Sequence, residues 1–400
     1  MAGRDGIPNR TFLEQVDDVG MEGCPARLLL LALTALLAGP PAARAQSVDT
    51  IVTWNRVLLV ALAVPGANAP TVFGTRPQAI ASIAVFDAVN SFDRLYHPYA
   101  ALIEVAPGAS RDAAAAAAKA ILEGRTGDGW EQPFSSLDLP SLPGYWKPTP
   151  PANLNATFTN YPYVRGFVVE NGRRFLMEGP PAMSSERYAT DFNEAKTYGA
   201  VGSTLRNADQ TQVAQVWAGV GTSTQAGFVW NLVFGDLARS RALSGVAAAR
   251  GFALLNMAQH DALMTSFTAK FIYLFWRPVH AVRGADADGN SATEADPTWT
   301  PLLNTPPYPG HPGNMACLGA SQSRVMERIF GRDDIPFSVT WTGTTNPSVT
   351  RSYNGFRQLS DEEANSRIWG GIHFRFESLA SIGSCSLLGD YAADNVLRRR

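Results

Sequence analysis

The sequence predicts a mainly α-helical protein. Apolar residues recur at helical spacing in several stretches, and no stretch shows the strict alternation that is typical of a half-buried strand. The 400 residues are 46% hydrophobic and 17% charged, which is the composition of an ordinary globular protein. Because the formal net charge is only −2, the chain has no basic surface for a polyanion, and we expect no nucleic-acid partner.

The first 45 residues have the layout of a leader followed by a secretory signal peptide. Arg27 supplies a positive charge, residues 28–38 are apolar, and Ala43-Arg44-Ala45 has the small residues of a cleavage site. The apolar stretch is much shorter than the roughly 20 residues that span a bilayer. We therefore expect a secreted or periplasmic protein with no stable membrane span.

Residues 46–205 are predicted to form an N-terminal helical and irregular wrapping region. Two helices are expected within 49–90, with a break at the Gly- and Pro-containing stretch 65–70, and a third over 110–123. Frequent Pro, Gly, Asn and Ser residues then interrupt any long element in 127–205. This segment is expected to wrap around the core or to act as a linker.

Residues 206–400 are predicted to form the helical core. Asn207 or Asp209 is the expected N-cap of its first helix, and a long helix is predicted from about Asp236 to Trp276. Continuous helical patterns in this region leave little room for strands.

Cys317 and Cys385 would be the two cysteines left after removal of the signal peptide. Disulfides form in the oxidising compartments that exported proteins reach, so a bridge between them is one interpretation. Two buried free thiols are at least as good an interpretation, because free cysteine is commonly buried.

Lys270 and Arg277 are the first pair of residues that indicates chemistry. They lie seven positions apart, or about two helical turns, so both side chains are expected on one face of the long helix, which Pro278 then ends. A buried pair of cations requires an anion, whereas an exposed pair is ordinary surface charge. The spacing alone does not decide between the two.

The second feature is Thr305-Pro-Pro-Tyr-Pro-Gly-His-Pro-Gly-Asn-Met315, which precedes a helix. Pro312 fits the first helical turn, and the amides of Gly313 and Asn314 would then point along the positive end of the helix dipole. Such a helix start suits an oxyanion, although ordinary helices that begin with proline have the same pattern.

The third feature is Ser366-Arg-Ile-Trp-Gly-Gly-Ile-His373. Its two glycines interrupt the helix and would let Arg367 and His373 turn toward one point. Glu377 lies four residues beyond His373, on the same helical face. Three cations, a histidine and a helix start that converge in this way indicate a site for an oxyanion.

These three features resemble the signature of the vanadium-dependent haloperoxidase and type 2 phosphatidic acid phosphatase superfamily: Lys-x6-Arg-Pro, Pro-Ser-Gly-His and Ser-Arg-x5-His-x3-Asp. Residues 270–278 match the first block and residues 366–373 match the third. Flanks such as 275–278 and 371–374 resemble the secreted bacterial haloperoxidase-like branch. The resemblance extends over most of the mature chain and implies a helical-bundle core like that of haloperoxidases and acid phosphatases.

The resemblance also implies a role for each site residue. Five residues would hold the anion's oxygens through charged or neutral donors: Lys270, Arg277, Gly313, Asn314 and Arg367. His373 would bind the metal of vanadate through one ring nitrogen, or attack phosphorus in a phosphatase. Glu377, where the family has Asp, would accept a hydrogen bond from the other ring nitrogen.

One departure from the signature concerns its acid/base histidine. In the favoured alignment residues 312–315 lie over Pro-Ser-Gly-His, so Met315, which carries no proton, takes the place of that histidine. In the alternative register His311 is the substitute. Loss of general acid/base help lowers a rate by a factor on the order of 100 to 10,000, so anion binding would survive better than turnover.

The resemblance therefore implies three functions. The leading one is a vanadate-dependent haloperoxidase-like enzyme that activates hydrogen peroxide and oxidises a halide or a small organic substrate. The second is a phosphomonoesterase that acts through a phosphohistidine at His373. The third is a catalytically impaired oxyanion-binding protein, which Met315 favours. The sequence fixes neither the oxidised substrate nor the oligomeric state.

Overall fold

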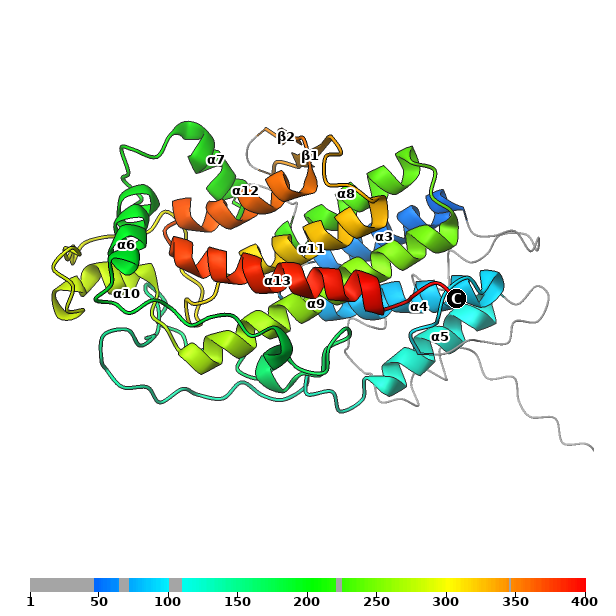
Figure 1. The fold of residues 1–400 in the computed structure, drawn as a ribbon, viewed down its shortest axis with the longest axis horizontal. Helices are drawn as coiled ribbons and strands as arrows, with labels where there is room; N and C mark the ends of the chain where they lie inside the picture. Colours follow the sequence, from blue (N-terminus) through cyan, green and yellow to red (C-terminus); the bar gives the residue numbers. More distant parts are fainter. Residues whose placement is uncertain (1–46, 65–71, 101–109, 221–224, 345–346) are drawn as a thin grey trace, which may run out of the picture.

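The computed structural model of the protein describes residues 47–64, 72–100, 110–220, 225–344 and 347–400. The predicted leader and signal peptide lie outside these residues. Most of the described chain is helical, and long helices run side by side along the molecule (Figure 1). The prediction of a mainly α-helical protein is confirmed.

The N-terminal part forms the three predicted helices, which are α3 (Val48–Ala63), α4 (Thr75–Asp93) and α5 (Ser110–Gly124). The hydroxyl of Ser47 caps α3 by accepting a hydrogen bond from the amide of Thr50 at 3.2 Å. Helix α4 packs against both α5 and the central helix of the core, so the N-terminal helices form one body with the rest.

The segment after α5 is largely irregular, as predicted. It contains two short 3-10 helices and one α-helix, which are η1 (Tyr161–Tyr163), η2 (Gly172–Phe175) and α6 (Glu186–Gly199). Helix α6 was not predicted, because its polar and Gly-ending sequence was interpreted as part of the irregular segment. It lies beside α10 at the end of the molecule opposite the C-terminus (Figure 1).

A buried carboxylate fastens the irregular segment to the core. Both oxygens of Asp261 accept hydrogen bonds from consecutive backbone amides, those of Phe167, Val168 and Val169, at 2.7, 2.7 and 2.8 Å. Because the backbone has no strand or helix partner here, this carboxylate satisfies amides that burial would otherwise leave unpaired.

The core continues through α7 (Ala208–Trp217), α8 (Ala226–Ser240), α9 (Gly245–Tyr273) and α10 (Pro278–Arg283), followed by η3 (Ala285–Ala287). Asn207 caps α7 in a capping box with Gln210. Of the two predicted N-caps, Asn207 and Asp209, the first is therefore the one observed. The prediction of a single long helix from Asp236 to Trp276 was wrong. The chain breaks after Ser240, and Ser244 caps a new helix.

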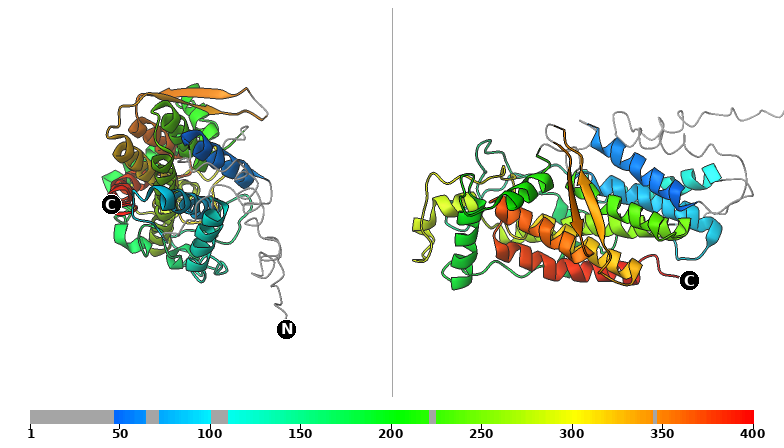
Figure 2. Two further views of the ribbon diagram at one scale, coloured as in Figure 1. Left: turned by 90° about the vertical axis from the view of Figure 1, so that its right-hand side faces the viewer. Right: turned by 90° about the horizontal axis from the view of Figure 1, so that it is seen from above.

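The C-terminal part consists of α11 (Asn314–Phe330), β1 (Phe337–Trp341), β2 (Val349–Tyr353), α12 (Phe356–Trp369) and α13 (Arg375–Asn395). The strands pair antiparallel with Phe337 opposite Tyr353, and this hairpin stands at the edge of the bundle (Figure 2). Sequence reasoning missed it although Phe337-Ser-Val-Thr-Trp341 alternates apolar and polar residues, with serine and threonine pairs on its outer face, because the run is only five residues long.

Helix α9 lies at the centre of the core, and nearly all of its residues are buried. Helix α11 packs against it and against α13, beside which it runs in Figure 1. A disulfide between Cys317 and Cys385 joins α11 to α13, so of the two interpretations of these cysteines the bridge is the one observed. No helix in the described ranges is both long and apolar enough to cross a bilayer.

Candidate functional site

Lys270 lies on the last turn of α9 and is fully buried. Its ammonium group donates hydrogen bonds to the carbonyls of Pro309 at 2.9 Å and Gly310 at 2.5 Å, and also to that of Pro312. Burial, together with the charge of Arg277, lowers the pKa of Lys270 well below its usual value. The lysine therefore fastens the loop before α11 to the end of α9.

Arg277 does not share a helix with Lys270, and this part of the prediction was wrong. Helix α9 ends at Tyr273, and Leu274 then takes a left-handed conformation with φ 53° that turns the chain. Arg277 is the extended N-cap of α10, so Pro278 begins a helix instead of ending one. The two cations still meet, because Arg277 turns back toward the loop that Lys270 holds.

The guanidinium of Arg277 connects three parts of the site. Its Nε donates to the carbonyl of Tyr308 at 2.9 Å, and its Nη1 donates to the carbonyl of Ile372 at 2.8 Å. The same Nη1 lies 3.0 Å from Nε2 of His373. Its Nη2 is buried and has no hydrogen-bond partner among the described residues.

The glycine pair separates α12 from α13, as predicted. Gly371 has φ 73°, a conformation that side chains disfavour, and its backbone lies against that of Gly199. Arg367 lies on the last turn of α12, where its Nη1 is buried without a partner in the described part of the chain. Burial lowers the pKa of Arg367 to about 10.

His373 and Glu377 form the hydrogen bond that the resemblance implies. Nδ1 of His373 donates to Oε2 of Glu377 at 2.5 Å, which leaves Nε2 as the acceptor of the Arg277 hydrogen bond. Burial and the neighbouring cations lower the pKa of His373 well below its usual value, and burial raises the pKa of Glu377 to about 7. The imidazole therefore stays neutral, with a lone pair on Nε2.

The start of α11 differs in detail from the prediction. Gly313 is the N-cap, so Pro312 precedes the helix and does not lie in its first turn. The amide of Gly313 is not free, because it donates to the carbonyl of Glu377 at 3.1 Å. Asn314 accepts a hydrogen bond from Ser266 at 2.6 Å, and its Nδ2 is buried without a partner among the residues described.

The two alignments place His311 or Met315 at the position of the acid/base histidine, and neither side chain has a free proton to transfer. His311 is fully buried, its Nε2 donates to the carbonyl of Glu178 at 2.7 Å, and its ring centroid lies 5.3 Å from that of Tyr273. Burial lowers the pKa of His311 to about 4. Met315 is buried in the first turn of α11.

Tyr308 is a site residue that sequence reasoning missed. Its ring centroid lies 5.0 Å from Cζ of Arg277 and 5.5 Å from Nζ of Lys270, so one aromatic ring contacts both cations. Its position between two prolines in the second block was a signal, but nothing in the sequence shows which way its side chain points.

The electrostatics of this assembly favour an anion. Three cationic side chains, Lys270, Arg277 and Arg367, lie around His373, and Glu377 is the carboxylate in direct contact with that histidine. Three of the surrounding donor atoms are buried and unpartnered within the described ranges: Nη2 of Arg277, Nη1 of Arg367 and Nδ2 of Asn314. A tetrahedral oxyanion would give these donors their acceptors.

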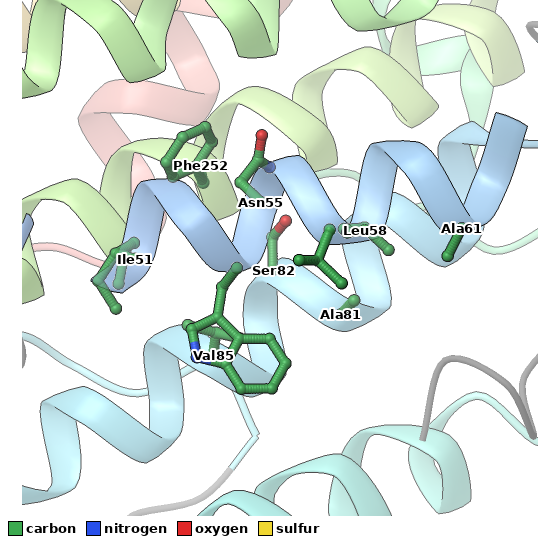
Figure 3. Close-up of a pocket in the computed structure, with 11 residues that line it drawn as sticks. Ile51, Asn55, Leu58, Ala61, Ala81, Ser82, Val85 and Phe252 are labelled. Atoms are coloured by element: carbon green, nitrogen blue, oxygen red, sulfur yellow. The ribbon is translucent and has the colours of Figure 1, made fainter. Parts of the chain in front are cut away.

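An apolar groove lies elsewhere, between α3, α4 and α9 (Figure 3). Side chains such as Ile51, Leu58 and Phe252 line it, and Asn55 and Ser82 are its polar groups. Because no charged side chain lines this groove, it does not suit an oxyanion.

Comparison with known proteins points to one kind of relative. Residues 250–400 match the family model of the VCPO second helical-bundle domain. Vanadium chloroperoxidase of Curvularia inaequalis is 26% identical over 190 residues, which cover 36% of this chain and 30% of that protein. The match thus spans less than a third of the relative's length.

Solved structures show the same fold over nearly the whole chain. A bacterial vanadium-dependent iodoperoxidase superposes with a TM-score of 0.73 at 19% identity, covering 90% of this chain and 98% of that one. The apo form of a bacterial vanadium-dependent chloroperoxidase gives a TM-score of 0.66 at 13% identity, covering 82% of this chain and 95% of that one. The predicted haloperoxidase-like helical bundle is confirmed.

Proposed function

Because the chain is a relative of the vanadium haloperoxidases and has their fold, we propose that it binds vanadate at this site and acts as a haloperoxidase-like enzyme. The observation that carries the proposal is the set of buried, unpartnered donors around a neutral His373. Buried guanidinium groups without an acceptor are unfavourable in a folded protein, and an oxyanion removes that penalty.

In this proposal the free nitrogens of Arg277 and Arg367, with Nδ2 of Asn314, donate hydrogen bonds to the oxygens of the anion. Lys270 adds positive charge while it keeps the loop before α11 in place. Bound vanadate would act as a Lewis acid that activates hydrogen peroxide for oxygen transfer to a halide or a small organic substrate.

His373 is proposed as the protein ligand of the metal. Glu377 holds the proton on Nδ1, so Nε2 carries the lone pair that would bind the metal. Arg277 donates to that lone pair at 3.0 Å, and its Nη1 would have to leave Nε2 for the histidine to bind the metal. The freed Nη1 then becomes one more donor to the oxygens.

Phosphate is also tetrahedral, so the same donors suit a phosphomonoesterase in which Nε2 of His373 attacks phosphorus. Such an enzyme must protonate a leaving alkoxide. Met315 carries no proton, and Nε2 of His311 already donates to the carbonyl of Glu178. The same two residues favour a second candidate function, an oxyanion-binding protein with impaired turnover.

Calorimetric titration with orthovanadate, followed by an assay with peroxide and bromide, tests the proposal. We expect wild-type protein to bind vanadate, and Arg367→Ala to abolish binding because a buried cationic donor is lost. Arg357→Ala, which removes an exposed arginine of the same helix, is the matched control and should bind like wild type. Unchanged affinity in Arg367→Ala would remove the site assignment, and binding without bromide oxidation would favour the impaired or phosphatase alternatives.

A further inference from the structure

The oxyanion site has several free N–H donors, but few of its groups carry a proton that could be transferred. Nε2 of His311 donates to Glu178, Met315 carries no proton, and Nδ1 of His373 donates to Glu377. Tyr308 also carries a hydroxyl, and its ring lies over both Lys270 and Arg277.

The position of Tyr308 is fixed from several sides. Its ring centroid lies 5.1 Å from that of Phe267 and 6.0 Å from that of Phe158. Its carbonyl accepts the Nε hydrogen bond of Arg277, and that guanidinium also lies against its ring. A ring held in this way has little freedom to turn its hydroxyl away from the site.

The hydroxyl itself is available. Tyr308 is partly exposed; its phenolic oxygen accepts a hydrogen bond from the guanidinium of Arg277, and its O–H donates to no group among the residues that the structure describes. Burial lowers the pKa of both Arg277 and Arg367, and the phenol opposes this shift at each of them, as expected if it lies near both guanidinium groups. The two buried guanidinium nitrogens without acceptors belong to these same arginines.

Glu363 is less suitable than Tyr308 as a donor to the anion. It is buried on α12 one turn before Arg367, but its Oε2 accepts a hydrogen bond from Nε1 of Trp230 at 2.9 Å. The space beside its carboxylate is that left by Gly319, in the second turn of α11. Glu363 therefore lies behind Arg367 and not beside the bound anion.

We infer that Tyr308 is a further ligand of the oxyanion, and that its phenolic O–H donates a hydrogen bond to an anion oxygen from the exposed side of the site. The inference rests on the proposed function, because it requires an anion between the two arginines. Lys270, Arg277 and Arg367 supply charge from the buried side, and Tyr308 completes the set with a neutral donor.

Titration of the full chain with orthovanadate and, separately, inorganic phosphate tests this inference. Tyr308→Phe keeps the ring against both cations and removes only the hydroxyl, so affinity for both anions should fall about tenfold, the effect of one hydrogen bond to a charged group. Tyr308→Leu also removes the ring and should weaken binding further. Tyr163→Phe, at an exposed tyrosine, is the control.

A spectroscopic measurement separates a ligand from a merely structural residue. Phosphate has no near-ultraviolet absorption, so its binding should perturb the tyrosine spectrum of wild-type protein and not that of Tyr308→Phe. Without phosphate, the melting temperature of Tyr308→Phe should equal that of wild-type protein. Wild-type binding with equal affinity in Tyr308→Phe would overturn this inference alone. No binding by the wild-type protein would overturn the proposed function and this inference with it.

Discussion

One carboxylate oxygen of Glu377 accepts two hydrogen bonds. Its Oε2 accepts a hydrogen bond from Nδ1 of His373 and another from the amide of Phe374 at 3.1 Å. The second contact satisfies an amide at the beginning of α13, where no intrahelical partner exists. The glutamate thus fixes the histidine relative to the helix that follows it, although the family motif has the shorter aspartate here.

We predict that Glu377→Ala lowers affinity for vanadate by roughly 10- to 100-fold, as loss of a hydrogen bond behind a metal-ligating histidine does. Glu377→Gln keeps an acceptor oxygen for Nδ1 and should lose less. Calorimetric titration measures both. Glu186→Ala removes an exposed first-turn glutamate from α6 and serves as the control. Equal affinity in Glu377→Ala and in the control would show that the histidine is oriented without this carboxylate.

The family resemblance was sufficient to predict the hydrogen bond between His373 and Glu377, because both residues belong to one short motif. It was not sufficient for Gly313, whose amide was expected to be free. The partner of that amide is the carbonyl of Glu377, which comes from a different helix. Contacts between distant segments depend on packing, which a local pattern does not contain.

The loop before α11 acts as an element in its own right, although it contains no regular structure. The ammonium of Lys270 gathers the carbonyls of Pro309, Gly310 and Pro312, and the amide of Gly310 donates to the carbonyl of Phe275 at 2.8 Å. Because the backbone turns around one ammonium group, it packs closely against Trp276 and Glu377, and Gly310 has almost no free space for a side chain.

We predict that Gly310→Ala destabilises the protein by about 1–3 kcal/mol, as overpacking does. A Cβ atom there would lie 2.5 Å from the carbonyl oxygen of Trp276 and 2.7 Å from Oε1 of Glu377. Gly383→Ala, in the middle of α13 with open space around it, should instead stabilise by up to about 1 kcal/mol. Equilibrium unfolding in urea measures both, and equal stability of the two variants would contradict the close packing at Gly310.

Element boundaries were predicted less well than element types. Apolar periodicity runs through the break between α8 and α9, so the pattern did not reveal it, although Ser244 before Gly245 is a capping signal. The end of α9 was placed at Pro278 because proline usually stops a helix. Leu274 ends it earlier by a left-handed turn that this residue type rarely adopts, and no sequence rule predicts it.

At the scale of the whole molecule, buried titratable groups link stability to pH. Burial lowers the pKa of four histidines: His260, His280, His311 and His373. Burial also raises the pKa of Asp261 to about 6, of Glu377 to about 7 and of Glu363 to about 8. The folded protein therefore prefers these histidines neutral and these carboxyl groups protonated.

We predict that the melting temperature is highest near pH 6 in the absence of an anion. Below about pH 6.5 the unfolded chain protonates its histidines before the folded protein does, so stability is lost on acidification. Above about pH 4.5 the carboxyl groups ionise in the unfolded chain before they ionise in the folded protein, so stability is lost as pH rises toward 8. The two effects oppose each other between these values.

Calorimetric scans between pH 4 and 9 test this, with Glu363→Gln as the informative variant. Glutamine keeps an acceptor for Nε1 of Trp230 and cannot ionise, so the decline in melting temperature above pH 7 should become shallower. An alkaline decline that is identical in wild type and Glu363→Gln would show that this carboxyl group is not responsible.

The bridge between Cys317 and Cys385 closes a covalent ring that contains most of α11, the hairpin, α12 and the first half of α13. Arg367, His373 and Glu377 all lie within this ring. A single proteolytic cut inside it yields two polypeptides that stay joined through sulfur, so the nicked protein keeps all three residues on one molecule. Only a cut combined with reduction separates the His373 segment from the helix start at Gly313.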